Sequence, residues 1–77
     1  MERDLRLRIL GFLSKSDRAV DFFVLARELD VEVTSLAKEL DILVSEKRFV
    51  MAVRSDSGSS YEMTPSGMEE LKSLEGR

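Results

Sequence analysis

Residues 33–53, VTSLAKELDILVSEKRFVMAV, decide the fold. The apolar residues in the first part of this segment recur with the spacing of one buried helix face, at Val33, Leu36, Ala37, Leu40, Leu43 and Val44. Thr34 has a side chain suited to an N-cap, so we predict a helix over residues 34–46. Residues 49–53, FVMAV, then have the β-branched and aromatic composition of a strand. The segment therefore predicts a helix that leads directly into a strand.

The residues that follow predict a hairpin and a last helix. Residues 55–60, SDSGSS, form a polar turn in which Gly58 can adopt a positive φ, and residues 61–63 form the returning strand. Thr64 is the expected N-cap of the last helix, and Pro65 suits its first position because no helical hydrogen bond is lost there. The apolar stripe of this helix is Met68, Leu71 and Leu74, and Gly76 fits its end.

The segment before residue 33 predicts two further helices. In residues 3–13 one face carries Leu5, Ile9, Phe12 and Leu13, whereas Leu7 and Leu10 lie to the other side. Either this helix is buried over more than half of its circumference, or Leu7 and Leu10, together with Leu74, face a second subunit. Residues 19–21 form a short extended stretch, and Asp21 caps a helix over residues 22–29.

Length and composition limit the class of protein. The chain has 77 residues, enough for one small domain over residues 1–77. It contains neither Cys nor His, which excludes disulfides and thiolate metal sites and argues against structural zinc; we expect no metal and no cofactor. No apolar run is long enough for a membrane span, and the N-terminus lacks the layout of a signal peptide. We therefore expect a soluble, cytoplasmic protein.

The same composition argues against an enzyme. The chain offers no His or Cys and no glycine-rich phosphate loop, and its carboxylates have the spacing of solvated helix faces. Glu69 and Glu70, for example, fall in the first turns of the last predicted helix, where negative charge is favourable to the helix dipole. We expect a binding domain without catalytic residues.

The order of these elements, with these residues, resembles the winged helix-turn-helix family of small prokaryotic regulators. Residues 25–31, LARELDV, look like the second helix and tight turn, with the small Ala26 where the helices pack most closely. Residues 36–50 resemble a recognition helix leading into the first strand of the wing. Residues 61–67, YEMTPSG, resemble the family's tyrosine, any, leucine, threonine, proline, any, glycine segment. The resemblance implies an α+β fold with a three-helix core, a β-hairpin wing and a C-terminal helix.

One position departs from the family pattern. Many relatives have glycine after the recognition helix, where a residue turns into the left-handed region. Here Lys47 or Arg48 must take that conformation, at some cost because of its Cβ atom.

The resemblance also implies double-stranded DNA as the partner. In DNA-binding members the third helix enters the major groove and the wing touches the backbone or the minor groove. Carried over to this chain, the expected contacts of the helix are Thr34, Ser35, Lys38, Glu39, Ile42 and Ser45. Those of the wing and its approach are Arg48, Arg54, Ser55, Ser57, Ser59 and Ser60. The expected function is that of a small transcription regulator.

Charge and hydropathy leave a second function open. The net charge is −3, and the predicted helix face sets Lys38 against Glu39 and Glu46, which limits the neutralisation of phosphates. Residues 47–61 carry three basic and one acidic side chain, which suits DNA, and a homodimer would double the basic contacts. Ile42, apolar in the middle of the polar face, is either an ordinary exposed residue or the anchor of a protein partner in a transcription or replication assembly.

Overall fold

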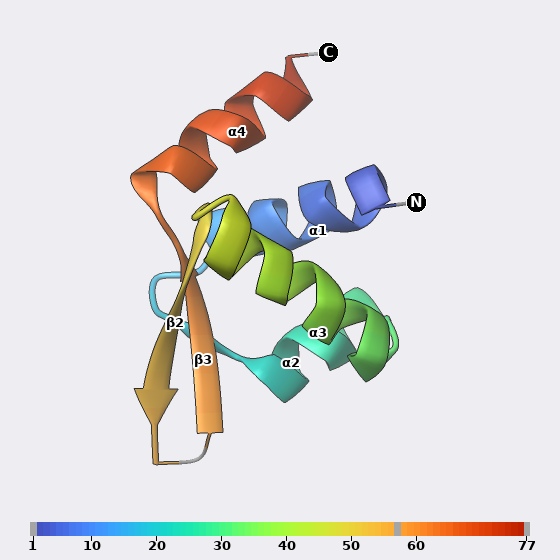
Figure 1. Cartoon of the computed structure of the whole chain (residues 1–77), viewed down its shortest axis with the longest axis vertical. Helices are drawn as coiled ribbons and strands as arrows, with labels where there is room; N and C mark the ends of the chain where they lie inside the picture. The colour runs from blue at the N-terminus through green and yellow to red at the C-terminus, as the bar shows by residue number, and fades with distance from the viewer. Residues whose placement is uncertain (1, 57, 77) are drawn as a thin grey trace.

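The computed structural model describes residues 2–56 and 58–76, which form a small α+β domain. In chain order its elements are α1 (Glu2–Ser14), β1 (Val20–Asp21), α2 (Phe22–Leu29), α3 (Val33–Asp41), the π-helical segment η1 (Ile42–Glu46), β2 (Val50–Ser55), β3 (Gly58–Met63) and α4 (Pro65–Glu75). Figure 1 shows the β2–β3 hairpin extending away from α4, so that its tip and α4 lie at opposite ends of the molecule. The helices α1, α2 and α3 lie beside the hairpin.

The described strands form one antiparallel sheet with the order β1-β3-β2. Val50 pairs with Met63 at one end of the hairpin, and Ser55 pairs with Gly58 at the other. The predicted turn over residues 55–60 was therefore too long, because β2 continues to Ser55 and β3 begins at Gly58. Serines can occupy strand positions here since the hairpin tip projects from the helices, and Gly58 takes a φ of 134°.

The core lies between the helices and one end of the hairpin. Its buried apolar residues are Ile9, Leu10, Leu13, Leu25, Ala26, Leu29, Leu36, Leu40, Leu43, Val50 and Leu71. Every α-helix and η1 contributes at least one of them, as the predicted apolar faces required. Met68 is an exception to the predicted stripe of the last helix, because it is 38% exposed.

Helix α1 is buried on more than one side, as the first of the two interpretations of its wide apolar surface requires. Leu10 is fully buried within the domain, so the prediction that Leu10 faces a second subunit was wrong. Leu7 and Leu74 are half-buried and pack against the core. The physical reason is that α1 lies between other elements and contacts α2, α3, α4 and β3.

Helix α3 begins earlier and ends differently from the prediction. Glu32, in an extended conformation, is its N-cap residue and its carbonyl accepts a hydrogen bond from the Leu36 N–H, so the prediction of Thr34 as the cap was wrong. Val33 is 46% exposed rather than part of the buried face. After Asp41 the helix widens, and the Lys47 N–H bonds the Ile42 carbonyl at 3.0 Å. The predicted helix is thus continuous, but its last turn is π-helical.

Thr64 joins the start of α4 to the start of β2. Its hydroxyl oxygen accepts a hydrogen bond from the Gly67 N–H at 3.1 Å and donates one to the Arg48 carbonyl at 2.7 Å. The Thr64 N–H bonds the Phe49 carbonyl at 3.0 Å. The predicted cap at Thr64, with Pro65 as the first residue of the helix, is confirmed. These bonds hold the N-terminus of α4 close to the backbone of residues 48 and 49.

Candidate functional site

The outer side of α3 and η1 carries polar side chains with few internal partners. Thr34, Ser35, Lys38 and Ser45 are all exposed, as predicted. The Ser45 hydroxyl donates to the Asp41 carboxylate at 3.5 Å. The side chain of Lys38 has no ion pair or hydrogen bond within residues 2–56 and 58–76. The ammonium group of Lys38 is therefore available to an external anion.

Glu39 is not on this outer side, although the sequence analysis placed it there. It is 4% exposed, and its carboxylate accepts a hydrogen bond from Arg6 Nε at 3.2 Å, which forms an ion pair between α3 and α1. The helical period carries position 39 to the flank of α3 that packs on α1, and Arg6 supplies the cation that a buried carboxylate needs. The negative charge of Glu39 is thus neutralised inside the domain.

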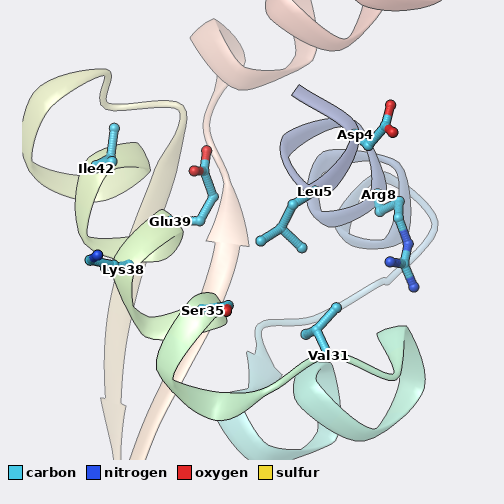
Figure 2. A pocket seen from close by; sticks show the side chains of 8 residues that line it. All are labelled: Asp4, Leu5, Arg8, Val31, Ser35, Lys38, Glu39 and Ile42. Atoms are coloured by element: carbon cyan, nitrogen blue, oxygen red, sulfur yellow. The ribbon is translucent and has the colours of Figure 1, made fainter. Parts of the chain in front are cut away.

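Ile42 lies in a groove rather than alone on an exposed face. The groove runs between α1 and α3 and has a volume of about 540 Å³. Ile42 is half-buried and lines this groove together with Leu5 and Val31. Figure 2 shows Leu5 and Val31 directed into the space between the helices, whereas Ile42 points away from them. Leu5 and Val31 were not predicted at this site, because helical periodicity assigns apolar residues to a face and does not show which face is left partly uncovered.

Arg48 turns the chain from η1 into β2. Its φ of 58° lies in the left-handed region, as the sequence predicted for Lys47 or Arg48, and Lys47 keeps a right-handed conformation. The side chain of Arg48 is exposed. The Thr64 hydroxyl bonds the Arg48 carbonyl and stabilises this turn. An arginine therefore occupies a backbone position that favours glycine.

Replacing Arg48 by Gly is expected to raise the free energy of unfolding by about 1 kcal/mol, since glycine adopts a positive φ without a Cβ penalty. Urea unfolding followed by circular dichroism measures the difference. The neighbouring Lys47→Gly variant is the control and should lose stability, because Lys47 is not left-handed. A loss of stability in Arg48→Gly would contradict this account of the turn.

The hairpin places its candidate residues on two paired strands. Arg54 and Ser59 are exposed and face each other across the ladder, whereas Ser60 is half-buried and pairs with Val53 and with Asp21 of β1. Ser57 and the side chain of Ser55 lie outside the described part of the structure. Arg54 is thus the described cation closest in sequence to the hairpin tip.

The helix and the hairpin flank a common cleft. Its lining comes from α3 and η1 on one side and from β2 and β3 on the other: Ala37, Leu40, Asp41, Val44, Ala52 and Tyr61. The exposed cations between residues 33 and 60 are Lys38, Lys47, Arg48 and Arg54. Exposed carboxylates lie among them at Asp41, Glu46 and Asp56. The exposed charges of α3, η1 and the hairpin therefore nearly cancel. This surface would be more acidic if Glu39 were also exposed.

Two features are absent from the described residues. Within residues 2–56 and 58–76 no group of three or more acidic side chains is placed to hold a metal ion. None of the described helices has the length and apolar character needed to cross a membrane.

Comparisons with protein-family models, with curated proteins and with solved structures found no match to this chain. The class that the structure defines is a small α+β domain with a three-stranded antiparallel sheet.

Proposed function

We propose that the chain is a winged helix-turn-helix protein that binds double-stranded DNA through α3, η1 and the β2–β3 hairpin, as a small transcription regulator. The observation that carries this proposal is the division of charge on α3. Lys38 is exposed with Thr34 and Ser35 beside it, whereas the charge of Glu39 is paired with Arg6 inside the domain. This division removes one obstacle to the approach of phosphates.

The arrangement of the elements supports the fold part of the proposal. A short turn joins α2 to α3, with Asp30 left-handed at a φ of 54° and the Val31 N–H bonded to the Ala26 carbonyl at 3.1 Å. A hairpin follows α3 and η1, and β1 adds to its β3 edge. In winged helices the second of two such helices is the reading helix and the hairpin is the wing.

The residue types on this surface fit contacts to the DNA backbone. Lysine and arginine neutralise phosphates, and serine and threonine hydroxyls donate to phosphate oxygens or base edges. Three exposed carboxylates lie among these cations, and their negative charge repels the same phosphates: Asp41, Glu46 and Asp56. We therefore expect modest affinity that falls strongly as salt rises.

Replacing Arg54 by Ala is expected to weaken DNA binding by a similar factor on all sequences and to reduce the salt slope by about one, because one phosphate contact is lost. Fluorescence anisotropy on two unrelated duplexes over a range of salt concentrations measures both quantities. Arg18→Ala is the matched control, since Arg18 is also exposed but lies between α1 and β1. If the salt slope of Arg54→Ala equals that of the unmutated protein, the hairpin does not contact the DNA.

A protein-interaction role centred on Ile42 is the second candidate. Ile42 offers less exposed apolar surface than the sequence indicated, but Leu5 and Val31 add to it in the groove. Ile42→Asp should then abolish association with the partner.

A homodimer through Leu7 and Leu74 is a separate proposal. Sedimentation at micromolar concentration should report a dimer, and a monomer there would contradict it.

A further inference from the structure

We propose that the groove between α1 and α3 binds a small amphipathic carboxylate, an organic acid with one carboxylate group and a short apolar chain. Three apolar residues line the groove: Leu5 comes from α1, Val31 from the turn before α3, and Ile42, at the edge, from the start of η1. Figure 2 shows Leu5 and Val31 directed into the space between the helices. These three side chains would contact the apolar chain of the ligand.

The charges around the groove select an anion. Four charged side chains line it: Asp4, Arg8, Lys38 and Glu39. Glu39 is already neutralised by Arg6, and Arg8 donates to the uncharged Leu29 carbonyl, which leaves its positive charge without a carboxylate partner. Lys38 has no partner among the described residues. The remaining balance is two cations against Asp4, which complements a single negative charge.

The position of the donors on α3 indicates where the carboxylate would lie. Ser35 and Lys38 are one helical turn apart, so their side chains are neighbours on the helix surface. Figure 2 shows the Ser35 hydroxyl on the side of α3 that faces the groove. One carboxylate oxygen would accept from the Ser35 hydroxyl. The Lys38 ammonium group, which Figure 2 shows directed away from Leu5 and Val31, would turn toward the ligand to donate to the other oxygen. Ile42 lies one further turn along and would meet the first carbons of the chain.

The size of the groove favours a small molecule over a protein. Its volume of about 540 Å³ falls in the range of roughly 300–1,000 Å³ typical of small-ligand sites. A stable protein interface needs about 800 Å² on each partner, far more than the eight residues that line this groove provide. The occupant is therefore expected to lie largely within the groove.

Occupation of the groove would also compete with DNA. Ser35, Lys38 and Ile42 belong both to the groove and to the proposed DNA-contacting surface of α3 and η1. This consequence rests on the proposed function, whereas binding of the carboxylate does not. The two are tested separately, first without DNA and then with it.

The test is an NMR titration of the full chain with octanoate, following methyl and amide signals. We expect saturable shifts confined to the methyl groups of Leu5, Val31 and Ile42 and the amides of Ser35 and Lys38. Lys38→Gln should weaken binding about tenfold, as the loss of a charge-assisted hydrogen bond implies. Lys47→Gln, an exposed lysine outside the groove, is the matched control and should bind octanoate as the unmutated protein does.

Two analogues and one DNA measurement complete the test. Octylammonium and 1-octanol should bind at least tenfold more weakly than octanoate; equal binding of either would overturn the assignment of a carboxylate. Absence of saturable shifts at millimolar octanoate, or shifts scattered over the surface, would overturn the site itself. Added octanoate should lower DNA affinity, and unchanged affinity at saturating octanoate would overturn the competition. If the chain binds no DNA at all, the octanoate titration still decides the site.

Discussion

Replacing Gly67 by Ala is expected to lower the free energy of unfolding by about 3 kcal/mol, which is most of the stability of a domain of this size. A Cβ atom at Gly67 would overlap the Phe49 carbonyl oxygen and would lie 2.6 Å from Met63 Cγ and 3.0 Å from the Phe49 carbonyl carbon. Met63 can move, but the Phe49 backbone cannot move freely. It is held by bonds from the Phe49 N–H to the Leu43 carbonyl and from the Thr64 N–H to the Phe49 carbonyl. The substitution must therefore separate α4 from the start of β2.

Gly11→Ala provides the matched control for Gly67→Ala. Gly11 lies inside α1, and nothing lies within 4 Å of the position that its Cβ atom would take. Alanine is the better helix former, so this variant should gain up to about 1 kcal/mol. Urea unfolding followed by circular dichroism compares the two variants. Equal stability of the two would contradict the close approach of α4 to Phe49.

Replacing Glu39 by Ala is expected to cost about 2 kcal/mol of unfolding free energy. The substitution leaves the Arg6 guanidinium without its carboxylate next to the core, and breaking a buried pair typically costs about 3–5 kcal/mol. The Arg6 side chain is 22% exposed, so partial hydration reduces the penalty. Chemical denaturation of Glu39→Ala, Arg6→Ala and the double variant gives the coupling energy between the two residues.

A second substitution separates loss of charge pairing from loss of volume. Glu39→Leu combined with Arg6→Met replaces the pair by apolar groups of similar size and should be close to neutral in stability. In this double variant Thr34, Ser35 and Lys38 remain exposed on α3, so its affinity for DNA should match that of the unmutated protein. A Glu39→Ala variant within about 0.5 kcal/mol of the unmutated protein would place Glu39 among ordinary surface residues and would contradict its burial.

The sequence was sufficient for the elements whose signals are local. Asp21 and Thr64 cap their helices through the predicted hydrogen bonds, and the apolar period located Leu36, Leu40 and Leu43 in the core. The left-handed turn after the third helix was also predicted, and it falls on Arg48. Each of these features depends on residues close in sequence, which is why a single sequence was enough.

The contacts between elements were harder to predict. Helical periodicity places Glu39 off the main apolar stripe, and only the packing of α1 on α3 shows that Arg6 meets it. The same packing determines that Leu10 is internal and that Leu5 and Val31 share a groove with Ile42. The length of the hairpin was underestimated because SDSGSS has the composition of a loop, whereas its serines pair along a strand.

The proposed site changes accordingly between sequence and structure. Thr34, Ser35, Lys38, Ser45, Arg48, Arg54 and Ser59 are exposed where contacts with DNA were predicted. Glu39 is buried and paired with Arg6, so it is not part of the exposed surface. Ile42 lies at the edge of a groove that the sequence did not indicate. The electrostatic objection to DNA binding is therefore weaker than composition suggested, although Asp41, Glu46 and Asp56 still limit the expected affinity.

The most direct test of DNA binding is an amide NMR titration with a mixed-sequence duplex, first at low salt and then at physiological salt. Phosphate attraction is strongest at low salt, where a weak electrostatic contact is easiest to detect. We predict shifts clustered at residues 34–48 and 54–60 that diminish as salt rises. Unchanged amide signals at low salt would show that double-stranded DNA is not the partner of this domain.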